Sequence, residues 1–259
     1  MTNFIKIENK INSYDKKIQV SGDKSISIRC VLLASQAIGK SKIYNLLESE
    51  DVSNSLKSIK KLGIKYKKYK NYYEIEGLGI NGFKKKKFTE INAGNSETFA
   101  RLILGFLVNY PGVVKISGDK SLSKRDFSRI TIPLSQFGAN IINSNNSLPV
   151  KISGTEYLRP IDYIEKLGSA QCKSSIMFAA LKTPGITRVK AKKSRNHTEI
   201  LCKHLSLPVV VKKRKKYDEI KVNKVKKIPP LNYNIPSDIS SSAFFIVLTA
   251  LSKNSKLTI

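Results

Sequence analysis

Short apolar runs that resemble strands alternate along this chain with longer segments in which apolar residues recur every three or four positions. KIQVSG (17–22) predicts a strand, and the apolar segment from Ser25 to about Ile38 predicts a helix that Gly39 closes. A second helix is predicted by one apolar face, made of Val52, Leu56, Ile59 and Leu62.

The same alternation continues through the rest of the chain. NYYEIEG and GVVKISG predict strands, and a helix is expected to begin near Asn95 or Ser96, which are favourable N-cap residues. The helix after GVVKISG carries an apolar face of Phe127, Ile130, Leu134 and Phe137. Further helices are expected to begin near Ser169, Arg195 and Ser240. The pattern predicts an α/β (α+β) fold in which strands lead into helix N-termini.

One internal repeat is visible in the sequence. VSGDKSIS (20–27) matches ISGDKSLS (116–123) except for two conservative apolar exchanges, and PSDISSSAF, which begins at Pro236, resembles both more weakly. Repeated segments of this kind indicate repeated supersecondary units. We therefore expect a domain assembled from related α/β units.

The composition narrows the class of protein. A hydrophobic content of 41% favours a globular fold, and no apolar run reaches the roughly 18 residues that suggest a membrane span. The polar N-terminus lacks a secretory signal, so a cytoplasmic protein is expected. The three scattered cysteines are expected to be buried free thiols, and the two histidines have no zinc-site spacing, so neither a metal nor a cofactor is expected.

The formal net charge of +28 is the strongest compositional signal. Such a charge suits a nucleic-acid-binding protein, because neutralisation of phosphates drives that binding. Most of the 47 basic residues are lysines, however, and they spread through every segment, with runs at residues 84–87 and 212–221 that predict solvated hairpin tips. A compositional bias of the coding sequence would produce the same abundance of lysine, isoleucine and asparagine. An anionic small molecule is therefore the favoured ligand.

The first repeat has the chemistry of an anion site. A strand ends in Ser21-Gly22-Asp23 and a helix opens at Lys24-Ser25, so backbone N–H groups and the positive end of the helix dipole point toward a possible anion. Arg29 lies four residues after Ser25 and therefore shares its helix face. A capped core helix with two incidental surface cations would produce the same pattern.

Other helix entries repeat this polar character. Asn95, Thr98 and Arg101 cluster at one helix N-terminus, and Arg125 is expected to begin the helix after the second repeat. Two more entries carry Ser169, Gln171, Lys173 and Arg195. Polar caps occur in any helix, but five such entries with nearby cations together predict a site for several phosphates or for a phosphate and a carboxylate.

Eight motifs in order resemble the 5-enolpyruvylshikimate-3-phosphate synthase family, and in particular its glyphosate-tolerant bacterial class. They span residues 17–259 and are GDKSIS with Arg29, LLESEDV, AGNSETFARL, GDKSLSKR, SAQCKS, LKTPGIT, SRNHTE and SDISSSAFF. The resemblance implies transfer of the enolpyruvyl group of phosphoenolpyruvate to the 5-hydroxyl of shikimate 3-phosphate. It also implies release of phosphate through a tetrahedral intermediate, no metal or organic cofactor, and a monomer.

The resemblance also implies roles for individual residues. Lys24 would contact both substrates and act in catalysis, whereas Ser25, Arg29, Ser169 and Arg195 would hold shikimate 3-phosphate. The phosphoenolpyruvate side would be formed by Lys24, Glu97, Arg125 and Gln171, with Gln171 between the two ligands. Such a cationic pocket makes chemical sense, because two polyanions must be held together against their repulsion.

The sequence departs from the family pattern at several positions. Ile28 and Asn196 stand where histidine and aspartate are usual, and Glu97 occupies a position usually held by glycine or alanine beside phosphoenolpyruvate. The family's general-base aspartate and other catalytic groups belong to a second half that we expect to be missing after Ile259. The chain alone is accordingly expected to lack turnover.

The implied fold consists of βαβαββ units in two domains. Residues 17–235 would form a complete N-terminal substrate-binding domain, and residues 1–16 and 236–259 a fragment of the C-terminal domain. Three alternatives remain: an inactive anion-binding remnant of the family, the related enolpyruvyl transferase of cell-wall synthesis, and a lysine-rich nucleic-acid-binding module. The cell-wall enzyme carries Lys-Asn at the Lys24-Ser25 position and lacks SRNHTE, which argues against it.

Overall fold

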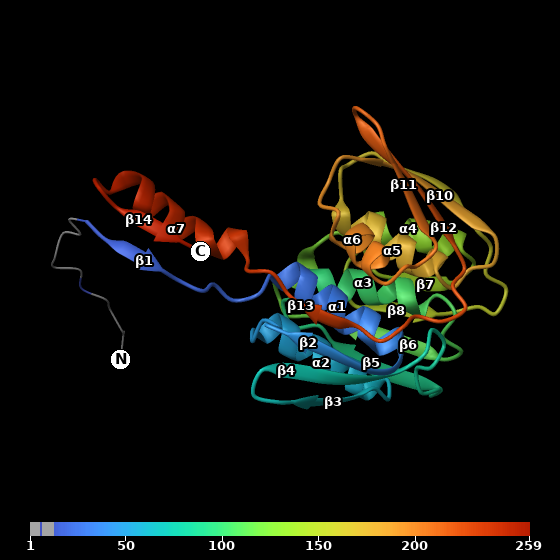
Figure 1. Ribbon diagram of the computed structural model, residues 1–259. Coiled ribbons are helices and arrows are strands. Elements are labelled where there is room, and N and C mark those ends of the chain that lie inside the picture. The colour runs from blue at the N-terminus through green and yellow to red at the C-terminus, as the bar shows by residue number, and fades with distance from the viewer. Residues whose placement is uncertain (1–5, 7–12) are drawn as a thin grey trace.

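The body of the protein is built from three α/β units that share one order of elements (Figure 1). The structure is a computed structural model, and it describes residue 6 and residues 13–259. Each unit contains a four-stranded sheet and two helices, in the chain order βαβαββ where the unit is continuous. The predicted architecture of repeated βαβαββ units is therefore confirmed.

The second and third units are continuous in sequence. The second contains β5 (Phe88–Asn92), α3 (Glu97–Leu107), β6 (Val113–Ser117), α4 (Ser128–Gln136), β7 (Asn140–Asn143) and β8 (Val150–Ser153). The third contains β9 (Asp162–Glu165), α5 (Ala170–Ala180), β10 (Ile186–Lys192), α6 (His197–His204), β11 (Val209–Lys213) and β12 (Tyr217–Asn223). In both units the first two strands are parallel and the other pairs are antiparallel.

The first unit is completed by a strand from far along the chain. It contains α1 (Lys24–Gln36), β2 (Ile38–Tyr44), α2 (Glu50–Lys61), β3 (Lys65–Lys68) and β4 (Tyr72–Leu78). Its remaining strand is β13 (Asn232–Asn234), which pairs in parallel with β2, so that Tyr233 lies opposite Ile43. The chain therefore enters and leaves the body through the same unit.

Helices α1, α3 and α5 form the centre of the body. Each is buried along most of its length, whereas α2 buries one face and has a solvated one. The rings of Phe106 and Phe178 stack 4.3 Å apart between α3 and α5. A Cβ at Gly105 would lie 2.3 Å from the carbonyl oxygen of Ser175, so glycine permits this close approach of the two helices. The polar starts of the central helices are thereby held together.

The internal repeat in the sequence marks a local cap rather than equivalent places in the units. The first copy runs into the first turn of α1, the first helix of its unit, whereas the second runs from the end of β6 into the 3-10 turn before the second helix of its unit. In both copies the aspartate caps the next turn: Asp23 Oδ1 accepts from Ile26 N, and Asp119 Oδ1 accepts from Leu122 N, each at 2.7 Å. The repeat therefore reflects shared local geometry.

Several predicted boundaries need correction. The first helix ends at Gln36 because Ala37 is extended, and Ile38 begins β2 by donating its N–H to Ile228 O at 2.9 Å. Arg125 does not begin a helix: it follows a 3-10 turn at Leu122–Lys124, and α4 starts three residues later. The lysines at residues 84–87 lie in an exposed connection between two sheets, whereas residues 214–216 form the tip of the β11–β12 hairpin.

A small lobe lies apart from the body (Figure 1). It consists of β1 (Asp15–Lys17), α7 (Ile239–Leu251) and β14 (Lys256–Thr258), with β1 and β14 parallel. The two connecting segments are joined by backbone hydrogen bonds, Asp23 N to Pro236 O and Asp238 N to Ser21 O, both 2.9 Å. The proposed division into residues 17–235 and a fragment of residues 1–16 and 236–259 stays a prediction, and residues 1–5 and 7–12 lie outside the described part.

Other features of the described residues bear on the sequence predictions. Cys30, Cys172 and Cys202 are buried free thiols, as predicted. Within the described part of the chain, no helix is both long and apolar enough to cross a membrane.

Candidate anion-binding site

A cavity of about 280 Å³ opens where the first turns of α1, α5 and α6 meet. Its polar lining consists of Ser25, Arg29, Arg101, Arg129, Ser169, Gln171, Arg195 and His197. None of the described residues that line it is an aspartate or a glutamate. Four arginines and three helix starts around one hollow produce a site suited to anions.

Arg29 is the most deeply held cation of the cavity. Its side chain is 2% exposed, and its Nε donates to Thr198 Oγ1 at 2.8 Å. Its Nη2 donates to Ser174 Oγ at 3.2 Å, and its Nη1 to the carbonyl of Ser25 at 2.9 Å. All three acceptors are neutral, so the guanidinium is fixed in place without an ion-pair partner in contact among the residues that the structure describes.

Burial lowers the pKa of Arg29 to about 10, although Glu199 and Asp23 oppose the shift and Arg195 adds to it. The residue therefore remains charged at neutral pH. A buried positive charge without a bound carboxylate is costly, and an external anion would relieve that cost.

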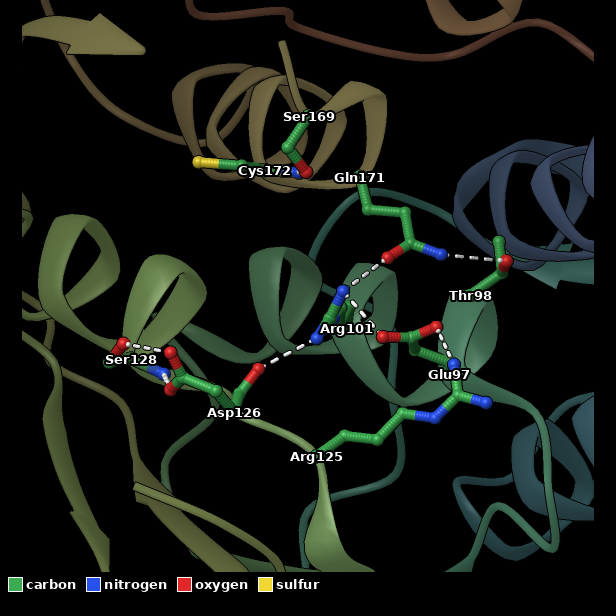
Figure 2. A network of polar contacts seen from close by, with 9 residues as sticks. All are labelled: Glu97, Thr98, Arg101, Arg125, Asp126, Ser128, Ser169, Gln171 and Cys172. Atoms are coloured by element: carbon green, nitrogen blue, oxygen red, sulfur yellow. Dashed lines mark hydrogen bonds and ion pairs between the residues drawn. The ribbon is translucent and has the colours of Figure 1, made fainter. Parts of the chain in front are cut away.

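The start of α5 contributes both a cap and a bridging amide. Ser169 is the N-cap and accepts a hydrogen bond from Cys172 N at 3.2 Å. Gln171 points toward α3, where its Oε1 accepts from Arg101 at 2.7 Å and its Nε2 donates to Thr98 at 3.1 Å (Figure 2). Gln171 therefore connects the start of α5 with Thr98 and Arg101 of α3.

The start of α6 adds an exposed arginine and a half-buried histidine. Arg195 precedes the helix, and His197 is its first residue. His197 Nδ1 is buried and has no hydrogen-bond partner among the described residues. Burial lowers the pKa of His197, and the nearby Arg29 and Arg195 lower it further. The ring is thus a polar group in a cationic cavity that an anion could engage.

Beyond Gln171, the Glu97 carboxylate bridges two arginines (Figure 2). Its Oε1 lies 2.6 Å from Arg101 Nη1, and its Oε2 pairs with Arg125 Nη1. Arg101 also donates from Nη2 to the carbonyl of Asp126 at 2.6 Å. The position of Glu97 at the first turn of α3 favours a negative charge, and the bridge fixes that charge against two cations.

The structure brings only some of the predicted residues to the cavity. Ser25, Arg29, Ser169, Gln171 and Arg195 line it. Arg125 and Glu97 lie beside it and pair with each other.

Two lysines lie away from the cavity lining. Lys24 is half-exposed and its Nζ lies 2.9 Å from Asp51 Oδ2. Lys173 does not face the helix entry as predicted: it is fully buried and pairs with Glu199 at 2.6 Å. Both lysines are drawn to carboxylates on neighbouring helices, α2 and α6, which the local sequence pattern did not indicate.

The sequence pattern indicated Arg101 as part of a polar helix start without a specific ligand, and it indicated no role for two other residues of the lining, Arg129 and His197. Arg101 lies one helical turn after Glu97 on the same face. Arg129 likewise follows Arg125 by four residues, but a break between the 3-10 turn and α4 separates the two. His197 stands within the quoted SRNHTE motif, and its position after Arg195 at a helix start could have indicated it.

The comparisons with known proteins agree on one family. The sequence model of the EPSP synthase family (3-phosphoshikimate 1-carboxyvinyltransferase) matches residues 8–259. The chain is 36% identical over 258 residues to the 3-phosphoshikimate 1-carboxyvinyltransferase of Streptococcus mutans, covering 98% of this chain and 59% of that protein. The enzyme of the same name from Vesicomyosocius okutanii is 38% identical over 254 residues, covering 98% and 57%.

A solved structure is similar over the same region. EPSP synthase from Acinetobacter baumannii, solved at 2.37 Å, matches with a TM-score of 0.85 and 33% identity, covering 95% of this chain and 55% of that one. The chain thus spans between half and three fifths of the length of the relatives it matches.

Proposed function

Because this chain belongs to the EPSP synthase family, we propose that its arginine-lined cavity binds shikimate 3-phosphate for enolpyruvyl transfer. In that reaction the 5-hydroxyl loses its proton as its oxygen bonds to C2 of phosphoenolpyruvate, and the methylene carbon of phosphoenolpyruvate takes up a proton. Loss of phosphate and of a proton from the new methyl group then restores the double bond. No oxidant, reductant or metal is needed for this balance.

The observation that carries the proposal is the state of Arg29. Its guanidinium is buried and fixed by neutral acceptors, in a cavity lined by three other arginines and by no carboxylate among the described residues. A phosphate monoester would supply the missing negative charge. In this arrangement Arg29 and Arg195 contact the phosphate oxygens, while Ser25 and Ser169 contribute hydroxyl and backbone donors at helix starts.

The phosphoenolpyruvate side lies next to the cavity in this proposal. Arg125 and Gln171 flank the boundary, and Lys24 reaches both ligands once it leaves Asp51. Glu97 belongs to this side as well, because it contacts Arg125 directly. We assign the chain to the glyphosate-tolerant class of the family on the motifs GDKSIS, SAQCKS and SRNHTE, and place it in the cytoplasm.

A second candidate function is anion binding without transfer. It is favoured by one observation: the Glu97 carboxylate beside the cavity is held by Arg101 and Arg125 and is therefore poorly placed to accept a proton. Under this reading the 259-residue chain binds shikimate 3-phosphate and releases no phosphate when phosphoenolpyruvate is added.

Titration calorimetry of the purified chain tests both readings. Shikimate 3-phosphate is expected to bind with an affinity that Arg29→Ala lowers by about tenfold or more. This loss corresponds to the free energy of the charge-assisted hydrogen bonds that the guanidinium would make to the phosphate. The control is Arg188→Ala, since Arg188 is half-exposed and faces Asp162 on the β9–β10 pair. Equal affinity in wild type and Arg29→Ala would contradict the site, and phosphate release from the two substrates would favour full catalysis over binding alone.

A further inference from the structure

The contact between Glu97 and Arg125 joins two separate segments of the chain (Figure 2). Glu97 is in the first turn of α3, and Arg125 follows the 3-10 turn after β6. The pair of Glu97 with Arg101 is an ordinary i,i+4 interaction of one helix, which local sequence explains. The pair with Arg125 has no such local cause. One carboxylate therefore contacts two arginines that the fold brings close together.

Arg101 is buried in an orientation that suits contact with an anion. Its Nε has no hydrogen-bond partner among the described residues. Its two terminal nitrogens are directed by Gln171 Oε1 and the carbonyl of Asp126. Neither of these two contacts involves Glu97, so the guanidinium would keep both of them after the carboxylate left.

The second arginine is open to solvent. The side chain of Arg125 is 46% exposed, whereas that of Glu97 is 21% exposed and that of Arg101 is 6% exposed. The site is therefore a buried cation and an accessible one, with a carboxylate between them. An anion that approaches from the side of Arg125 therefore meets the Glu97 carboxylate before it reaches Arg101.

We propose that Arg101 and Arg125 form a second anion subsite that Glu97 occupies as an internal ligand, so that a carboxylate or phosphate binds there by displacing the Glu97 side chain. The inference deepens the proposed function, since it concerns the phosphoenolpyruvate side of the same site. It makes Glu97 a specificity-determining residue: only a ligand that competes with a tethered carboxylate gains access.

The competition has a predictable size. A tethered side chain acts at an effective concentration in the millimolar range or above, so an external anion must overcome that local concentration. A released Glu97 would also remain near the incoming negative charge and repel it. Neutralising Glu97 removes both effects, so the affinity of the subsite for an anion should rise by tenfold or more.

The test counts inorganic phosphate bound per chain at constant ionic strength, by calorimetry and by ³¹P NMR. Glu97→Gln is expected to bind one more phosphate than wild type at the same phosphate concentration, and Arg125→Ala in the Glu97→Gln background should abolish the additional one. Glu90→Gln is the matched control, because it makes the same charge change at an exposed glutamate that pairs with Lys115. Glu90→Gln should bind as wild type does.

Three results would overturn the inference. They are no additional phosphate in Glu97→Gln, an additional phosphate that survives Arg125→Ala, or an equal gain in Glu90→Gln. If Glu97→Gln does not fold, Glu97→Ala is measured in its place, and failure of both to fold would mean that the bridge is structural. Because the readout is a difference between variants, it is independent of whether shikimate 3-phosphate binds to the neighbouring cavity.

Discussion

Arg29 on α1 donates from Nε to the hydroxyl of Thr198 on α6 at 2.8 Å, so one buried guanidinium connects the first unit to the third. The same hydroxyl donates to Ser174 Oγ on α5 at 2.7 Å. Three helix starts that are distant in sequence are thereby fixed around one positive charge. This small network therefore connects the helices that line the cavity.

Replacing Thr198 by valine is expected to destabilise the fold by about 1–3 kcal/mol, because it leaves a buried N–H of Arg29 without an acceptor. The measurement is denaturant unfolding followed by circular dichroism. Thr187→Val is the matched control, since the hydroxyl of this buried threonine has no partner among the described residues. A similar cost at both positions would show that the Arg29 network contributes nothing specific.

The sequence predicts this fold best where the structure depends on residues that are close together in the chain. The apolar faces of the helices were predicted correctly from the sequence, because buried residues recur every three or four positions, as at Phe127, Ile130 and Leu134. The strand β13 could not be placed in the first unit, because its partner β2 lies far earlier in the chain. Pairing across such a distance leaves no periodic trace in either segment.

The same distinction applies to the site. Ser25, Arg29 and Ser169, which line the cavity, could be predicted because a helix start is recognisable in sequence from its cap and its polar first turn. The partners of Lys24 and Lys173 were missed because Asp51 and Glu199 lie on other helices, and only the packing of those helices brings the charges together. A lysine at a helix start therefore does not by itself indicate an anion site.

Anion binding is expected to be coupled to proton uptake at His197. Burial and two nearby arginines hold the pKa of His197 below its ordinary value near 6.5, and a bound anion would raise it. In the free protein the protonated ring is disfavoured, so stability is full above pH 6.5 and falls as the pH drops through the lowered pKa. Binding should accordingly become tighter toward pH 6.

Sulfate is a suitable probe of this coupling, because it does not titrate near neutral pH. Calorimetry at pH 6 in two buffers of different ionisation enthalpy should reveal fractional proton uptake that His197→Asn removes. His204→Asn is the control on the same helix, since His204 packs against the ring of Tyr233 away from the cavity. Uptake that persists in His197→Asn would assign the proton to another group.

The small lobe is expected to drive self-association of the purified chain. The apolar side chains of α7 include Phe244 and Leu251, each 81% exposed, and an exposed apolar helix face favours contact with other molecules. Replacing both by serine should lower the weight-average mass in sedimentation experiments. Tyr157→Ser serves as the control, because Tyr157 is 88% exposed on the body. A strictly monomeric wild-type chain at high concentration would contradict the expectation.

The most direct test of the central claim is to map where shikimate 3-phosphate binds, by backbone amide NMR of the isotope-labelled chain. Binding to the arginine-lined cavity predicts that the shifted amides cluster at Ser25, at residues 168–173 and at His197, and that shikimate without the phosphate leaves them unchanged at equal concentration. Shifts confined to the lysine-rich hairpin tip at residues 214–216, or equal shifts with both ligands, would contradict the account.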